Sequence, residues 1–148
     1  MYRHILVSTD GSKLSVKAAR TAARLAKALG ASVTGVYVIA PYKVPMYSEG
    51  AAYAPPLTPQ RYKELTTVEA KKALAAIEVE AEIAGVPCST LSASNEDPWR
   101  AIIRVAQARK CDVIVMASHG RRGLSGLLLG SETNKVLTHS KIPVLVCR

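Results

Sequence analysis

Short apolar runs and longer amphipathic segments alternate along the chain. The runs are rich in Val, Ile and Leu, which is typical of buried strands, and the segments between them show the three- and four-residue spacing of helices. The runs that predict strands are HILVS (4–8), SVTGVYVIA (32–40), STLSA (89–93), DVIVMAS (112–118) and IPVLVCR (142–148). The segments that predict helices are 12–29, 58–84, 95–110 and 131–140. Strand and helix therefore alternate from the first run to the last.

Residues suited to helix ends stand at the predicted boundaries. Ser12 and Asp97 can accept hydrogen bonds from first-turn N–H groups, and Pro98 stands where its missing N–H costs nothing. Gly30 ends the first helix, because glycine readily takes the left-handed conformation found after a last turn. Residues 41–58 carry four prolines and little periodicity, so we expect a long loop there, either a lid or slack chain.

Apolar strands joined by helices predict an α/β fold with an open, mostly parallel sheet that helices cover on both faces. The 148 residues fit one domain, and such a domain buries roughly 68–70% of the surface that its unfolded chain exposes. The sequence shows no internal repeat and no low-complexity tract. We therefore expect a single domain over residues 1–148.

A glycine-rich stretch, ASHGRRGLSGLLLGS (117–131), joins the fourth predicted strand to the last helix. Ligands of open α/β sheets bind at the carboxyl ends of strands, and the turn STDGS (8–12) ends the first strand. Gly130 and Ser131 open a helix whose unpaired N–H groups can bind phosphate, with Arg121 to balance charge. Ser131 is also a candidate N-cap. The stretch predicts an anion site, and the alternative is a glycine-rich connection with an ordinary helix cap.

Two widespread patterns for nucleotide binding do not match. The P-loop needs G-x-x-x-x-G-K-[ST], but residues 126–131 are one residue short between the glycines and lack the lysine. No G-x-G-x-x-G follows the first strand, so the fingerprint of a nicotinamide or flavin dinucleotide site is missing. The sequence therefore favours neither of these two classes of site.

The formal charge of +9 suggests acidic partners. Five basic residues of the first predicted helix form one stripe, for which a solvated face is favoured over a nucleic-acid surface. The stripe consists of Lys13, Lys17, Arg20, Arg24 and Lys27. Three cysteines without metal-ligand spacing indicate reduced, mostly buried thiols, and neither a signal segment nor an apolar run of about 18 residues stands out. We expect a soluble, cytoplasmic protein.

The chain resembles the universal stress protein family over essentially its whole length. The likeness rests on the element order, on LVSTDGS (6–12), and on DVIVMASHG, LLLGS and IPVLVCR toward the end. The nucleotide-binding branch of that family carries G-x2-G-x9-G-[ST], whose fixed positions are Ala117, Gly120, Gly130 and Ser131. Three of the four match, and Ala117 departs from the pattern with a methyl group that narrows the site slightly.

The resemblance implies a Rossmann-like sheet of the adenine nucleotide alpha hydrolase type with strand order 3-2-1-4-5. It implies ATP as the ligand, or ADP or AMP, with Mg²⁺ or Mn²⁺ beside a triphosphate, and a homodimer in which the last strands pair. It places Asp10 beside the adenosine, the Val38 backbone at the adenine edge and the Glu132 N–H near phosphate. Because its charge would repel a phosphate, we expect the Glu132 carboxylate to point away. The implied binding residues are Ser8, Thr9, Asp10, Val38, Met116, Ala117, Gly120, Arg121, Gly130, Ser131 and Glu132.

Several of these residues have simpler alternatives. Asp10 could form the turn before Gly11, and Gly35 could either allow close approach of adenine or mark a bulge in its strand. A structural role is favoured for His119, because no partner carboxylate or nucleophile is identifiable. Trp99 is expected to be a packing anchor or a surface aromatic residue.

The sequence gives little support for catalysis. Phosphoryl transfer needs a positioned metal, a water-orienting or basic group and charge stabilisers, and only possible stabilisers and Asp10, as a remote metal candidate, are identifiable. We expect no enzyme beyond slow ATP hydrolysis, and we assign no metal ligands. The predicted function is a nucleotide-dependent regulator in a stress response, a link that rests on the resemblance alone. The alternatives are a homodimeric interaction module of the same fold without nucleotide, and nucleic-acid binding through the basic stripe, which predicts steep salt dependence.

Overall fold

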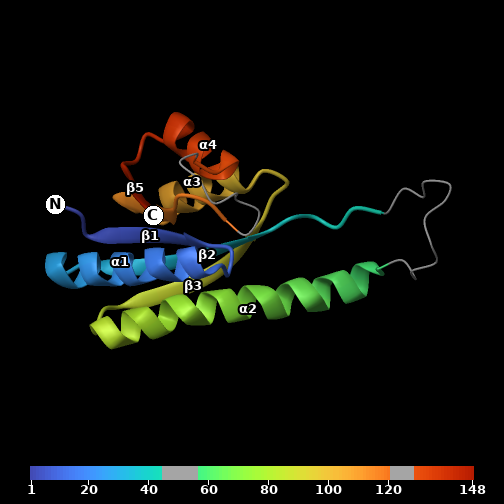
Figure 1. Cartoon of the computed structure of the whole chain (residues 1–148), viewed down its shortest axis with the longest axis horizontal. Helices are drawn as coiled ribbons and strands as arrows, with labels where there is room; N and C mark the ends of the chain where they lie inside the picture. Colours follow the sequence, from blue (N-terminus) through green and yellow to red (C-terminus); the bar gives the residue numbers. More distant parts are fainter. Residues whose placement is uncertain (45–56, 121–128) are drawn as a thin grey trace.

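Strands and helices alternate in the predicted order within the part of the chain that the structure describes (Figure 1). The structure is a computed structural model that describes residues 1–44, 57–120 and 129–148. The strands are β1 (His4–Thr9), β2 (Ser32–Ile39), β3 (Cys88–Ser94), β4 (Val113–Ala117) and β5 (Val144–Cys147). The helices are α1 (Lys13–Leu29), α2 (Pro59–Ala84), α3 (Pro98–Ala108) and α4 (Ser131–His139). Within these ranges, no helix has the length and apolar character that crossing a membrane requires.

The strands form one parallel sheet with the order β3-β2-β1-β4-β5. β1 is central, since Ile5 pairs with Val33 of β2 on one side and with Val113 of β4 on the other. The chain first builds outward from β1 to β3 and then crosses back to β4, so the strand order reverses between β1 and β4. The predicted doubly wound fold is confirmed, and the carboxyl ends of β1 and β4 lie side by side.

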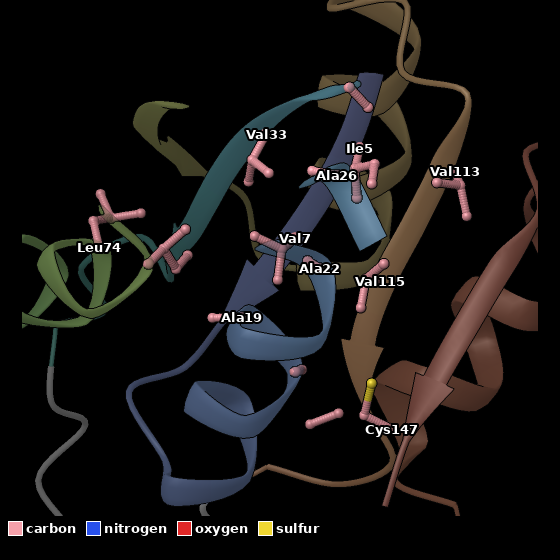
Figure 2. Close-up of a cluster of buried hydrophobic side chains, with 14 residues drawn as sticks. Ile5, Val7, Ala19, Ala22, Ala26, Val33, Leu74, Val113, Val115 and Cys147 are labelled. Carbon is pink, nitrogen blue, oxygen red and sulfur yellow. The ribbon is translucent and has the colours of Figure 1, made fainter. Parts of the chain in front are cut away.

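Helices cover both faces of the sheet, and the core has one layer on each face. Successive residues of β1 point to opposite faces, so Ile5 and Val7 pack with α1 and α2, whereas Leu6 packs with α3 and α4. Figure 2 shows the first layer, in which alanines of α1 lie over the strands and Leu74 of α2 approaches from the side. The small alanine side chains let α1 lie close to the sheet.

The predicted starts of α1 and α2 are confirmed. The Ser12 hydroxyl accepts a hydrogen bond from the Ser15 N–H at 3.2 Å, and Gly30 ends α1 with a φ of 64°. The Thr58 hydroxyl caps α2 in the same way, through the Arg61 N–H at 3.1 Å. Each cap satisfies a donor that has no partner inside its own helix. The possible lid over residues 41–58 falls mostly on 45–56, which lie outside the described residues.

One predicted cap position is confirmed and one is wrong. Asp97 occupies the cap position of α3 with Pro98 as the first helical residue, but its side chain makes no cap bond, and its carboxylate instead accepts from Arg100 Nε at 2.9 Å. Gly130 occupies the cap position of α4, and Ser131 is the first residue of that helix. The first-turn N–H groups of α3 and α4 are therefore satisfied by partners other than a cap side chain, that is by other parts of the molecule, by water or by a ligand.

Of the two alternatives for Gly35, the bulge is wrong. β2 keeps a regular register there, with Gly35 opposite Val7 on one side and Thr90 on the other. Gly35 is buried, and a Cβ built on it would lie 2.8 Å from Cδ1 of Ile77 in α2. The missing side chain therefore makes room for the close packing of α2 on the sheet.

Two of the three cysteines are buried as predicted, and the third is not. Cys111 and Cys147 lie in the core, whereas Cys88 is exposed at the start of the edge strand β3. Burial raises the pKa of the Cys111 thiol to about 11, and the neighbouring Asp112 contributes to the same shift. The thiols are free, so packing and not disulfides holds this fold together.

Candidate functional site

The carboxyl ends of β1 and β4 bring two distant stretches of sequence into contact. Asp10 follows β1 and Gly120 follows β4, and a Cβ built on Gly120 would lie 2.4 Å from Oδ2 of Asp10. The carboxylate and the glycine backbone therefore touch. This contact lies at the point where the strand order reverses, which is where ligands of open α/β sheets bind.

The turn after β1 is held by bonds from side chains to the backbone. Asp10 Oδ1 accepts from the Ser12 N–H at 3.0 Å, and Thr9 Oγ1 accepts from the Gly11 N–H at 3.1 Å. Gly11 has a φ of 79°, in the left-handed region that favours glycine. Asp10 is therefore a turn-forming residue, and the same turn brings its second oxygen, Oδ2, against Gly120.

The start of α4 is anchored to the end of β4. The Gly130 N–H donates to the Ser118 carbonyl at 2.7 Å, and the Thr133 hydroxyl donates to the Ala117 carbonyl at 2.9 Å. Gly130 is so close to the preceding loop that a Cβ built on it would lie 3.1 Å from the His119 Cα. The N-terminus of α4 therefore lies beside the residues that follow β4.

The first turn of α4 has no side-chain cap among the described residues. Its cap position is Gly130, which has no side chain, and Ser131 is exposed. Unpaired N–H groups and the positive end of the helix dipole make such a turn a suitable place for an anion. Phosphate is the anion that most often occupies this position in nucleotide sites.

The Glu132 carboxylate lies against the start of α3. Its Oε2 accepts from the Trp99 N–H at 2.9 Å, and its Oε1 pairs with Lys135 Nζ at 3.1 Å. Glu132 thereby replaces the cap that Asp97 does not supply. The Glu132 side chain thus binds the start of α3, whereas the Glu132 N–H is part of the first turn of α4, which has no side-chain cap.

Trp99 packs beside this link between α3 and α4. The indole is half-buried against the core layer on this face, and its ring centroid lies 4.5 Å from that of His139. The Arg100 guanidinium lies 4.6 Å from the indole centroid, at cation–π distance. The expected role of Trp99 as a packing anchor is confirmed.

Val38 lies at the same edge of the sheet as the turn after β1. Its neighbour Tyr37 pairs with Thr9, so Val38 is level with Asp10, one residue beyond the end of β1. Val38 packs on the same face as Leu6, and Ser8 of β1 is half-buried. The structure thus brings the residues predicted for the adenosine end to one edge of the sheet.

Met116 and Ala117 form the end of β4, and both are buried. Ala117 is 9% exposed and packs in the core layer under α1. The methyl group by which this position departs from the family pattern is therefore in contact with the core. Arg121, the basic residue predicted beside the phosphates, lies outside the described residues.

His119 is held by the loop and not by a carboxylate. Its Nδ1 lies 3.1 Å from the Ser118 hydroxyl oxygen, and the side chain is half-exposed. Across residues 1–44, 57–120 and 129–148, no three His, Cys, Asp or Glu side chains are grouped so that they could hold a metal ion. His119 packs against Gly130 through its Cα and Cβ atoms.

Two contacts of the site were missed by sequence analysis. Thr133 ties α4 to the Ala117 carbonyl, and the only signal is a hydroxyl residue in the first turn of a predicted helix. The bond between Glu132 and the Trp99 N–H joins residues 33 positions apart. No local pattern reveals such a pair, because it depends on how α3 and α4 pack.

The sequence model of the universal stress protein family matches residues 1–148. A universal stress protein of Methanocaldococcus jannaschii is 33% identical over 150 residues, a match that covers 100% of this chain and 83% of the relative. The chain belongs to the universal stress protein family. In this universal stress protein, the positions of the family's glycine pattern therefore fall at the end of β4 and the start of α4.

Solved universal stress proteins share the fold. The universal stress protein UspA from Lactobacillus plantarum has a TM-score of 0.77 at 26% identity, covering 99% of this chain and 98% of that one. The universal stress protein from Archaeoglobus fulgidus in complex with dAMP has a TM-score of 0.73 at 21% identity, covering 99% and 98%. At 21% identity, the similarity to the dAMP complex shows a shared fold and nothing further.

Proposed function

We propose that this universal stress protein binds an adenine nucleotide, ATP in the first place, at the carboxyl ends of β1 and β4. The observation that carries the proposal is the contact between Asp10 and Gly120 beside the uncapped first turn of α4. Carboxylate and carbonyl oxygens can accept from the hydroxyl and amino groups of adenosine, whereas N–H groups of a helix N-terminus suit phosphate. One edge of the sheet thus offers both kinds of partner.

The two ends of the nucleotide have separate groups of residues. The proposed adenosine end consists of Ser8, Thr9, Asp10 and Val38 over a floor of Met116 and Ala117. The proposed phosphate end consists of Gly120, Arg121, Gly130, Ser131 and the N–H of Glu132. Because no side chain is assigned to a metal ion, Mg²⁺ or Mn²⁺ would arrive with a triphosphate and be held mainly by its oxygens and by water.

The fold can hold an adenine mononucleotide, as the Archaeoglobus fulgidus protein in complex with dAMP illustrates for that chain. The support specific to this chain comes from its own glycines. Both Gly120 and Gly130 lie where a side chain would meet Asp10 or His119. The same contacts also supply a purely structural reason for the two glycines, so binding has to be measured directly.

Nucleotide binding is tested by denaturing the purified protein, identifying released nucleotide by mass spectrometry, and titrating ATP, ADP and AMP in a calorimeter. We expect an adenine nucleotide to be released or to bind at or below millimolar concentration. Gly130→Val should abolish binding and leave the circular dichroism spectrum unchanged, and Ser131→Ala should weaken binding without touching the loop contact. No released nucleotide and no heat at millimolar concentration would show that the proposal is wrong.

The proposed role is regulatory. We propose that nucleotide occupancy changes the shape or partner choice of a single unit spanning residues 1–148 in the cytoplasm, with slow ATP hydrolysis at most. Efficient phosphoryl transfer needs a base or a water-orienting group at the phosphates. His119, the titratable side chain closest to Gly130 among the described residues, is bonded to Ser118 and has no carboxylate to orient it.

A second candidate function is a homodimeric interaction module that works without nucleotide. The observation that favours it is the edge of β5, which pairs with β4 on one side only and carries Leu145 with 39% of its surface exposed. An apolar edge strand readily pairs with a second copy of the same strand. Sedimentation with and without ATP, beside the calorimetric titration, separates the two candidates. The interaction module should sediment as a dimer, bind no nucleotide and show the same sedimentation with ATP as without it.

A further inference from the structure

A second surface lies at the other end of α1, away from the proposed nucleotide site. The C-terminal halves of α1 and α2 border a hollow of about 290 Å³, and a neighbouring hollow of about 360 Å³ shares Lys27 and Ala84 in its lining. Together these hollows form what we term the α1–α2 groove. From Ser12 to Arg24 the rise of α1 separates the two surfaces by about 18 Å. The residues of the α1–α2 groove used below are Ala23, Arg24, Lys27, Ile83 and Ala84.

The α1–α2 groove is basic. Arg24 and Lys27 are exposed, and no carboxylate among the described residues lies within 4.0 Å of either charged group. The acidic residue of the groove, Glu80, is already bound by Arg20 through three contacts of 2.8 to 3.1 Å. The negative charge of Glu80 is therefore neutralised, and the positive charges of Arg24 and Lys27 are not.

The α2 side of the groove carries an exposed apolar residue. Ile83 of α2 is 74% exposed, Ala84 of the same helix also lines the groove, and Ala23 of α1, which is 2% exposed, completes its apolar lining. An isolated exposed isoleucine needs no explanation by itself. Here Ile83 lines the same hollow as Arg24 and Lys27. The two basic side chains can bind carboxylates of a partner, and Ile83 can bury an apolar side chain of the same partner.

We propose that the α1–α2 groove docks an acidic segment of a partner protein, with carboxylates against Arg24 and Lys27 and an apolar side chain against Ile83. The net charge of +9 favours an acidic partner and steers it toward the protein. The same charge opposes docking of a second copy, since the copy would carry the same excess of positive charge. This proposal goes beyond nucleotide binding and concerns different residues.

Two other acidic surfaces fit the groove less well. A single-stranded nucleic acid would need aromatic rings on which bases stack, and neither hollow has one in its lining. A membrane is flat, whereas the groove is concave, so a bilayer surface would reach its lining less well than a narrow protein segment. A protein segment alone combines carboxylates, an apolar side chain and a convex shape.

The probe for the test is a fluorescein-labelled synthetic helix with glutamates on one stripe and leucines on the adjoining stripe, measured by fluorescence anisotropy with the full chain. The double variant Arg24→Glu/Lys27→Glu should weaken its binding at least about tenfold. Ile83→Ser leaves the charge unchanged and should weaken binding about fivefold. The matched control Arg104→Glu/Lys141→Glu makes the same charge change at exposed positions outside the groove and should stay within about twofold.

Four outcomes would overturn the proposal. They are equal binding of a scrambled peptide of the same composition, no effect of Ile83→Ser, an equal loss in the control variant, and tighter binding of single-stranded DNA or phosphatidylserine vesicles through the same two basic residues. The circular dichroism spectrum and melting temperature of each variant establish that it is folded. Gly130→Val should bind the peptide as well as the original chain does, so a failure of nucleotide binding and a failure of docking are distinguishable.

Discussion

At the residue scale, the contact between Asp10 and Gly120 makes a specific prediction. A Cβ on Gly120 would lie 2.4 Å from Asp10 Oδ2, far inside contact distance, so Gly120→Ala must displace the carboxylate or the loop. Either movement disturbs the proposed adenosine end, and we expect ATP to bind about tenfold more weakly, a loss of about 1.4 kcal/mol. Calorimetric titration of the variant with ATP measures the loss.

A double-mutant cycle identifies the cause of that loss. If the methyl group acts by displacing the Asp10 carboxylate, Gly120→Ala should have little further effect in a chain that already carries Asp10→Ala. Melting temperatures of the four proteins serve as the control, because Asp10→Ala also removes the bond to the Ser12 N–H. Equal losses from Gly120→Ala in both backgrounds would mean that the glycine matters for a reason other than this contact.

At the scale of elements, Glu132 links the proposed phosphate end to α3. Glu132→Ala leaves the Trp99 N–H without its acceptor, and we expect a loss of about 1 kcal/mol in the free energy of unfolding. The indole packs beside this link, so the fluorescence of the chain's single tryptophan should change as well. Urea denaturation followed by tryptophan fluorescence measures both effects.

Two matched variants separate this link from the neighbouring ion pair. Glu132→Gln keeps an acceptor oxygen for the Trp99 N–H and should recover most of the stability that Glu132→Ala loses. Lys135→Ala removes only an exposed ion pair, which is worth about 0–1 kcal/mol, and should leave the fluorescence unchanged. If Lys135→Ala changed the spectrum as much as Glu132→Ala does, the cap on α3 would not be the cause.

The order of elements could be predicted because each strand and helix has a local signal in the spacing of its apolar residues and in its caps. Ser12 caps α1 as predicted, and Thr58 at the predicted start of α2 does the same; each hydroxyl accepts from the N–H three residues ahead. The cap of α3 could not be predicted in this way. Asp97 has the right type and place, but its carboxylate pairs with Arg100, and the donor it leaves is satisfied from α4.

At the scale of the whole molecule, the site likewise combines features with a local sequence signal and features that depend on packing. The glycine pattern and the turn after β1 are visible in the sequence, and the strand order that brings them together came from the family resemblance. The bulge at Gly35 was wrongly predicted because the glycine is needed to make room for Ile77. Ile77 lies on α2, and its position depends on how that helix packs on the sheet. Contacts that cross from one layer to another are the part that one sequence does not reveal.

At the same scale, we expect Asp112 to make the free energy of unfolding depend on pH. Its Oδ2 accepts from the Arg3 N–H at 2.7 Å and from the His4 N–H at 2.9 Å, which ties the start of the central strand β1 to the residue before β4. These two backbone hydrogen bonds, that from Arg3 first, lower the pKa of the Asp112 carboxyl below its ordinary value. The charged form is therefore favoured by folding.

The sign of the pH dependence follows from that shift. A carboxyl whose pKa is lower in the folded chain stabilises the fold at neutral pH, and this contribution is lost as the pH falls below the unfolded-state pKa of about 3.9 and through the folded value. Asp112→Asn keeps an oxygen acceptor but cannot ionise. At pH 7 the variant should melt at a lower temperature than the original chain, and the difference should shrink toward zero as the pH approaches about 2.

Melting curves of both proteins between neutral and acid pH test this prediction. The matched control is Glu69→Gln, which changes an exposed carboxylate that has no hydrogen bond or ion pair among the described residues. Its difference in melting temperature from the original chain should be small at neutral pH, because an isolated exposed charge contributes little to stability. If the difference in melting temperature between Asp112→Asn and the original chain stayed constant down to the lowest pH, the destabilisation would come from altered packing and not from the loss of the carboxylate charge.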